Sequence, residues 1–139
     1  MKKILILVLI SLSQYVFSQS ENNSSNNSPQ AVINEDNSIH ALTGVEVKPV
    51  FPGGSEELYR FIKENYKIPE TAGLKGKIYI TFIIEKDGSL SDIKVIRDLK
   101  HGTGEEAIRV LKIVPHWIPG KQNGKAVRVL YSMAIPINQ

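Results

Sequence analysis

The 139-residue chain contains no cysteine, and no stretch of it reaches 18 consecutive apolar residues. Without cysteine there is no disulfide, no thiolate nucleophile, no thiolate zinc site and no cysteine-linked lipid anchor. Without a long apolar run there is no ordinary membrane-spanning helix. The charge is close to balanced, with 17 Lys and Arg against 14 Asp and Glu, which argues against a general nucleic-acid-binding protein.

The first 18 residues have the pattern of a secretory signal peptide. Lys2 and Lys3 precede a mostly apolar segment that reaches Phe17, and the small Ser18 follows it. This pattern predicts cleavage before Gln19 and export of the chain. The alternative is an uncleaved N-terminus that anchors the chain to the inner membrane, although about 14 apolar residues of helix span only about 21 Å of a bilayer core that is about 30 Å thick.

The next segment, residues 19–44, is poor in side chains that could build a core. Residues 19–30 contain four Ser and four Asn, and the remainder up to Gly44 adds only isolated apolar residues. Such a composition predicts a disordered tether. We therefore expect one folded domain, at residues 45–139.

Two segments of this domain show helical periodicity. The first follows Ser55, which is expected to cap it, and ends before Pro69. The second follows Thr103 and stops at Pro115, and the spacing of Thr103 and Glu106 is that of a capping box. Both helices have one apolar face for packing against a sheet.

Three segments have the alternating pattern of β-strands. Residues 77–85 and 90–97 flank the turn signal Asp87-Gly88, and residues 127–137 follow a second turn signal, Asn123-Gly124. A right-handed crossover over the second helix would place the last strand beside the first. We predict an α+β fold of order helix-strand-strand-helix-strand, with a three-stranded sheet of order 2-1-3. The last strand should be an edge, as Pro136 also indicates.

No group of residues in the sequence points to catalysis. The three histidines, His40, His101 and His116, are far apart in the chain and follow no zinc-binding spacing. Trp117 is expected in the core. We therefore predict no enzyme activity, no catalytic residue, no metal, no cofactor and no small-molecule substrate.

The end of the chain is basic. Between Ala107 and the C-terminus there are five Lys or Arg residues and no Asp or Glu, at Arg109, Lys112, Lys121, Lys125 and Arg128. These residues form either a solvated basic face or a surface that attracts an acidic or carbonyl-rich peptide. For the second interpretation, Lys121 and Lys125 in the turn before the last strand are candidate binding residues.

Three motifs resemble the TonB family, in the form found in Bacteroidetes-type bacteria. Residues 45–54 read VEVKPVFPGG and resemble its V-E-x-x-P-x-F-P-G-G opening. Residues 76–88 resemble its G-x-V-x-V-x-F-x-V-x-x-D-G hairpin, and residues 117–127, WIPGKQNGKAV, are similar to its W-x-P-G-K-x-x-G-K-x-V signature. Together the motifs cover the whole domain, in order.

The resemblance implies a TonB C-terminal domain in the periplasm, which supports transport across the outer membrane. Such a domain docks on the TonB box, an extended segment of TonB-dependent outer-membrane transporters, by pairing with its last strand. Here the partner-binding residues would be Val127, Arg128, Val129, Leu130, Tyr131, Ser132, Met133, Ala134 and Ile135. In the family an inner-membrane motor grips an N-terminal helix and supplies the energy.

The chain departs from the family pattern at its N-terminus. It has a short apolar run and an Asn/Ser tether where a full transducer has a membrane helix and a long Pro/Lys/Glu-rich spacer. Coupling to the motor is therefore not expected if the N-terminus is cleaved. The alternative function is a detached module that binds other periplasmic peptides, or a second copy of itself, through the exposed edge.

Overall fold

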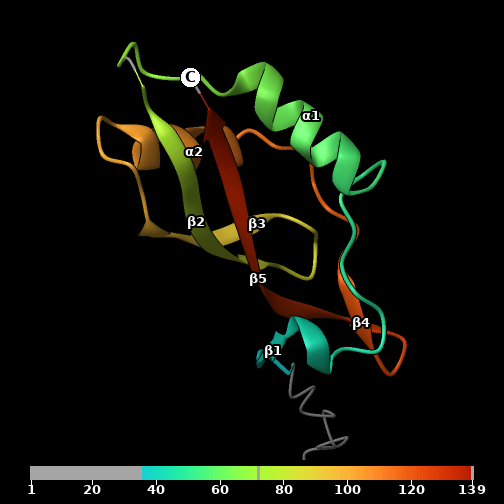
Figure 1. The fold of residues 1–139 in the computed structure, drawn as a ribbon. Coiled ribbons are helices and arrows are strands. Elements are labelled where there is room, and N and C mark those ends of the chain that lie inside the picture. Colours follow the sequence, from blue (N-terminus) through green and yellow to red (C-terminus); the bar gives the residue numbers. More distant parts are fainter. Residues whose placement is uncertain (1–35, 72, 139) are drawn as a thin grey trace, which may run out of the picture. The chain divides into compact units, whose positions relative to one another are not determined.

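The computed structural model describes residues 36–71 and 73–138, and these residues form one folded unit. Its elements are β1 (Ile39–Ala41), the short 3-10 helix η1 (Leu42–Gly44), α1 (Ser55–Asn65), β2 (Lys75–Ile84), β3 (Leu90–Arg97), α2 (Thr103–Leu111), β4 (Gly120–Gln122) and β5 (Lys125–Asn138). Figure 1 shows β5 and β2 side by side along the middle of the unit. The predicted α+β class and its two helices are confirmed.

The sheet is built on the long antiparallel pair of β2 and β5. Its strand order is β1-β5-β2-β3, and β4 also pairs with β5. The predicted order 2-1-3 is confirmed as β3-β2-β5, with β2 in the centre as its two apolar faces indicate. The predicted number of three strands is wrong, because the short strands β1 and β4 also pair with β5. Both predicted turns form, because Gly88 and Asn123-Gly124 adopt positive φ angles.

Both helices pack against the same face of the sheet. Their buried residues, among them Leu58 and Ile62 of α1 and Val110 and Leu111 of α2, share one hydrophobic core with alternate residues of β2 and β5. Trp117 lies in this core at 4% exposure, as predicted. The backbone of Trp117 also hydrogen-bonds to Gly88, where an added Cβ would lie 1.9 Å from the Trp117 carbonyl oxygen.

The structure corrects the predicted tether at its C-terminal end. Residues 36–44 belong to the folded unit, because β1 pairs in parallel with β5 and η1 leads on to the buried Val45. A strand of three residues is too short to show periodicity, so its pairing with residues 128–130 leaves no trace in the local sequence. The predicted signal peptide and residues 19–35 of the predicted tether lie outside the described residues.

The two predicted helix caps are also wrong. The N-cap residues are Gly54 and Gly102, and neither helix has a side-chain cap. Thr103 instead accepts a hydrogen bond from the Leu99 N–H and donates one to the Lys100 carbonyl. Glu106 accepts from the Lys67 N–H and pairs with Arg109. The preceding loop therefore takes the Thr103 hydroxyl, and Lys67 and Arg109 take the Glu106 carboxylate that the spacing assigned to capping.

Candidate functional site

The predicted binding strand lies at the border of the sheet, with one face in the core. Its odd-numbered side chains Val127, Val129, Met133, Ile135 and Ile137 are buried, and Tyr131 is half-buried. Leu130 and Ser132 are exposed on the opposite face, and Ala134 is partly exposed there. This alternation fixes which side chains face the helices, since a shift of one residue would expose the whole apolar set.

The first half of β5, from Lys125 to Leu130, pairs with two short strands. β1 pairs with Arg128–Leu130 on the border away from β2, and β4 pairs with Lys125–Val127 in a hairpin. Val129 and Leu130 also pair with β2. We call residues 125–130 the covered half. The prediction that the whole strand is an edge is therefore wrong for this half, because β1 pairs with residues 128–130 on the side away from β2.

A buttress of side chains fastens β1 to the covered half. The Arg128 guanidinium donates two hydrogen bonds to the Glu85 carboxylate, at 2.8 and 3.1 Å, and a third to the Asn37 carbonyl oxygen at 3.0 Å. The hydrogen bonds from Arg128 are the main reason why the pKa of Glu85 is held below its ordinary value. Arg128 is thus a structural residue that ties the start of the folded unit to β5.

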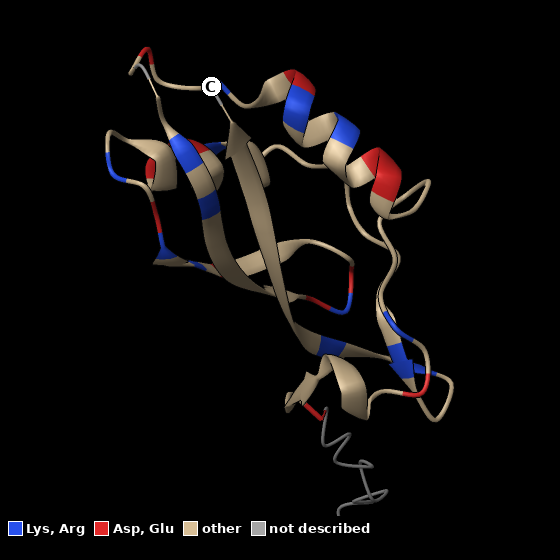
Figure 2. Ribbon diagram, in the orientation of Figure 1, with Lys and Arg blue, Asp and Glu red and all other residues tan. Residues whose placement is uncertain are grey.

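These pairings also break up the predicted basic face. Arg109 pairs with Glu106 and Arg128 with Glu85, so two of its five cations have acidic partners. Lys121 and Lys125 are exposed on the hairpin of β4 and β5. Figure 2 shows the blue of that hairpin apart from the uncharged upper length of β5. The exposed Lys121 and Lys125 are therefore at the covered half, and the rest of β5, residues 131–138, carries no charged side chain.

The second half of β5, Tyr131–Asn138, has a different border. Among the described residues it pairs only with β2, so its outer side has no strand partner. We call residues 131–138 the open half. The Tyr59 hydroxyl donates a hydrogen bond of 3.3 Å to the carbonyl oxygen of Ala134. This contact shows that the backbone groups of Ala134 face outward.

Backbone groups alternate in direction along a strand of an antiparallel pair. Since those of Ala134 face outward, those of Ser132 and Pro136 do too, whereas Met133 and Ile135 bond to β2. Pro136 has no N–H and contributes only a carbonyl. The open half therefore presents two N–H groups and three carbonyls between residues 132 and 136 to an incoming strand.

A groove runs beside this open edge. Helix α1 lies along the side of β5 that faces away from β2 (Figure 1), and a cavity of ≈ 380 Å³ separates helix and strand. It is lined by Tyr59, Ile62, Lys63, Tyr66, Ile68, Ile135, Pro136, Ile137 and Asn138. We call it the α1–β5 groove. Its walls are mainly apolar, and Lys63 supplies a single cation.

The groove includes residues that the sequence-based prediction missed. That prediction ended at Ile135 and included no residue of α1. The helical spacing of Leu58, Phe61 and Ile62 indicates one apolar face, with Tyr59 and Tyr66 at its flanks. The pattern alone does not show that this face extends beyond the core to the strand border. Exposed Tyr59 and Ile68, beside residues 135–138, are the additions that the structure makes.

The base of the open half is rigid. The Tyr131 ring stacks on Phe82 at a centroid distance of 5.5 Å and lies 5.0 Å from Trp117. Burial raises the pKa of the Tyr131 hydroxyl, which keeps it neutral well above physiological pH. An incoming strand would thus meet a preformed edge, with little side-chain entropy left to lose there.

Among residues 36–71 and 73–138, no three His, Cys, Asp or Glu side chains gather where they could hold a metal ion. Within the same residues no helix is long and apolar enough to cross a membrane.

Comparison with known proteins identifies the domain. The family model described as Gram-negative bacterial TonB protein C-terminal matches residues 68–138, just over half of the chain. No protein of curated function matches. Two solution structures of the Helicobacter pylori TonB C-terminal domain are similar to it at a TM-score of 0.38. One, of residues 194–285, is 23% identical and the match covers 58% of this chain and 89% of that one. The other, of residues 179–285, is 24% identical over 63% and 88%.

The matched residues run from the segment that follows α1 through the whole of β5. They include the central strand, the hairpin, α2 and both halves of the candidate binding strand. Domains of this family are periplasmic and non-catalytic, and they interact with outer-membrane transporters. The chain belongs to the family of Gram-negative bacterial TonB protein C-terminal domains.

Proposed function

We propose that this protein is a periplasmic docking module that binds the TonB box of outer-membrane TonB-dependent transporters by β-strand addition. The ligand would pair with the open half of β5, and the complex would support transport across the outer membrane. The observation that carries this proposal is the unpaired outer side of residues 131–138 beside a mainly apolar groove. An exposed row of backbone donors and acceptors is a template for an extended peptide.

The structure shifts the proposed footprint toward the C-terminus. Residues 127–130 contribute a buried face and the pairing with β1 and β4, so a ligand strand would begin at about Tyr131. Alternate ligand side chains would then lie against α1, where Ile62 and Ile68 favour apolar groups. Lys63 would favour an acidic residue near the end of the ligand strand. The exposed Lys121 and Lys125 lie on the hairpin at the start of the covered half, away from the open half, and would act at most on longer peptides.

The affinity should be modest. Five backbone hydrogen bonds, two from N–H groups and three to carbonyls, contribute about 1 kcal/mol each. Burial of apolar side chains in the α1–β5 groove adds a few kcal/mol. The loss of rotational and translational freedom costs at least about 4 kcal/mol, before the peptide itself is ordered. The net of about 4 kcal/mol corresponds to a dissociation constant near the millimolar range as an order of magnitude, which suits a partner that must be released.

The test uses two substitutions at one position. Ser132→Pro removes an outward N–H, while Ser132→Ala keeps it, and neither changes the core. A synthetic TonB-box peptide from a transporter of the same bacterium is titrated into the full chain by calorimetry, with circular dichroism to confirm folding. We expect binding to the parent and Ser132→Ala, and at least tenfold weaker binding to Ser132→Pro.

Two results would contradict the proposal. Equal binding of the peptide to folded Ser132→Pro would show that strand addition at the open half is not the mechanism. No binding to the parent, together with dimers in sedimentation that Ser132→Pro dissociates, would identify the edge as a self-association surface instead.

A further inference from the structure

The face of the sheet that lies away from the two helices is unusually apolar. An antiparallel sheet with one face toward solvent normally carries polar residues there. Here Tyr79 is 43% exposed, Leu130 44% and Ile96 64%. Leu130 pairs with Ile83, which the alternation of β2 places on the same side. We call this the open sheet face; it is separate from the backbone edge of β5.

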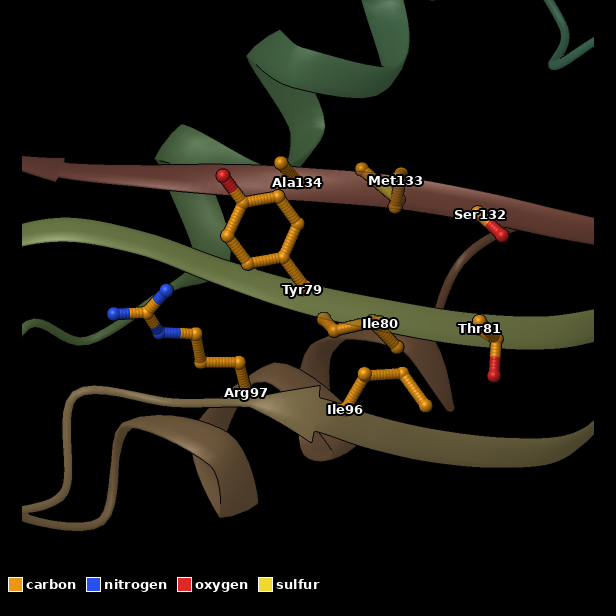
Figure 3. A pocket seen from close by; sticks show the side chains of 8 residues that line it. All are labelled: Tyr79, Ile80, Thr81, Ile96, Arg97, Ser132, Met133 and Ala134. Carbon is orange, nitrogen blue, oxygen red and sulfur yellow. The ribbon is translucent and has the colours of Figure 1, made fainter.

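A β-bulge presents the most exposed of these residues. Tyr79 pairs with Arg97 and Ile80 with Val95, so Ile96 is an extra residue without a partner in the register. Bulges turn a side chain out of the regular alternation and are over-represented at functional sites. In Figure 3, Ile96 and Arg97 line one side of a hollow whose other side is β5. The irregularity of β3 thus places an apolar and a cationic side chain together.

The hollow is a shallow groove of ≈ 570 Å³. Its floor includes the small residues Thr81, Ser132 and Ala134, and the larger Tyr79 and Ile96 rise beside them (Figure 3). A floor of small side chains between large ones accepts a rod-shaped element. A flat lipid layer would contact the protruding Tyr79 and Ile96 but would leave the groove unfilled.

The charges of the open sheet face that lack an ion-pair partner among the described residues are positive. Pairing and alternation place Lys77, Lys94 and Arg97 on it. Asp92 pairs with Lys94 at 3.1 Å, whereas Lys77 and Arg97 have no acidic partner within the described part of the chain. Two copies packed face to face would bring these cations together. The charge therefore disfavours a second copy and favours an acidic occupant.

From these observations we propose that the open sheet face docks an amphipathic helix of another protein, with acidic residues flanking its apolar stripe. Sheets bury an apolar face most often against helices. The apolar stripe would cover Tyr79, Ile96 and Leu130, and the flanking carboxylates would meet Arg97 and Lys77. This site takes a different ligand from the β5 edge and does not depend on peptide binding there.

The experiment places a photoreactive p-benzoylphenylalanine at Ile96 in the full chain, produced in its own bacterium. Ile113, which is 51% exposed beyond the end of α2, is the matched control position. After irradiation, the cross-linked peptide is identified by mass spectrometry. We expect a product at position 96 only, joined to a protein segment whose sequence is an amphipathic helix with acidic flanks.

Charge reversal separates this docking from chance contact. Arg97→Glu in the same labelled chain should lower the yield about fivefold or more, while Lys112→Glu should leave it unchanged. Lys77→Glu replaces Arg97→Glu if circular dichroism shows that the latter is unfolded. A product with phospholipid, with a second copy or with the chain's own N-terminal segment would overturn the proposal. So would a yield that charge reversal does not change, or no product above that of position 113.

Discussion

The two halves of β5 share one strand, one buried face and one partner in β2, yet their outer borders differ completely. The covered half is paired with β4 and β1, and Arg128 ties β1 to it through Asn37. Within residues 36–71 and 73–138, the outer border of the open half accepts one side-chain hydrogen bond, from Tyr59. The same alternating sequence pattern thus builds a structural strand at one end and an available edge at the other.

The comparison shows how the fold limits unspecific strand pairing at its exposed edge. An exposed edge strand of 14 residues would invite pairing with any extended chain. β1 occupies this edge at residues 128–130, the hairpin with β4 holds residues 125–127, and Pro136 removes one donor from the rest. What remains is long enough for about five backbone hydrogen bonds, which gives weak binding of one short peptide.

The largest expected effect is the difference in stability between proline substitutions whose N–H groups point to opposite sides of β5. Met133→Pro removes an N–H that bonds to β2 and places a ring in a buried position, so it should cost at least about 3 kcal/mol. Ser132→Pro, one residue earlier, removes only an outward N–H and should cost far less. Urea denaturation followed by circular dichroism compares the two. Similar losses for both variants would mean that the outward direction assigned to Ser132 is wrong.

The second effect concerns the covered half alone. A Cβ at Gly120 of β4 would lie 2.7 Å from Cγ2 of Val129 and 3.2 Å from the Val47 carbonyl oxygen. Gly120→Ala should therefore cost about 1–3 kcal/mol through overpacking. Gly44→Ala is the control, because a Cβ there meets no atom within 4 Å, and it should change stability by less than about 0.5 kcal/mol.

The peptide affinity of the same variant tests whether the two halves of β5 are independent. Below its melting temperature, Gly120→Ala should bind the TonB-box peptide as tightly as the parent, since the open half is untouched. Weakened binding by the folded variant would show that the two halves are energetically coupled.

The parts of the fold that the sequence predicted are those with repeated local signals. The run from Val127 to Ile137 alternates over eleven residues, and Asp87-Gly88 and Asn123-Gly124 supply positive φ angles at the two hairpin turns. Such signals need no knowledge of distant residues. They were enough for the hairpin, for the last strand and, with the handedness of the crossover, for the order β3-β2-β5.

The parts that were missed depend on distant partners. β1 has three residues and pairs in parallel with residues nearly ninety positions later, and β4 is a Gly-Lys-Gln segment without strand propensity. The α1–β5 groove likewise arises from where Tyr59 meets Ala134, a contact between residues 75 positions apart. A single sequence contains no local signal for such pairings, so the edge was predicted too long and the site lacked one wall.

The third effect is a pH dependence confined to β1. Because Arg128 lowers the pKa of Glu85 in the folded state, their pairing stabilises the fold fully above the ordinary carboxyl pKa of about 4.3. That contribution, about 1 kcal/mol, is lost as the pH falls through the lowered value. We expect the hydrogen-exchange protection of Ile39–Ala41 to decrease below pH 4 before that of β2.

Glu85→Gln provides the control for this effect. It should lower the protection of β1 at neutral pH and remove most of its dependence on acid. Glu106, whose pKa Arg109 lowers, lies at the α1–α2 side of the unit and should not affect β1. Loss of protection in β1 and β2 at the same pH in the parent would show that the buttress is not a separate local structure.

The smallest effect concerns Tyr59, whose side chain bonds to the open half. Tyr59→Phe removes the hydroxyl that donates to Ala134 and leaves the ring in place. Because Tyr59 is exposed and water can replace the hydroxyl, stability should fall by less than about 1 kcal/mol. A docking peptide must displace this hydrogen bond in the parent but not in the variant, so calorimetry should show binding that is about two- to threefold tighter.

Tyr79→Phe, which removes a hydroxyl from the open sheet face, should leave peptide affinity unchanged. Weaker binding by Tyr59→Phe would mean that the hydroxyl contacts the ligand, and its role would then be recognition instead of protection of the free edge.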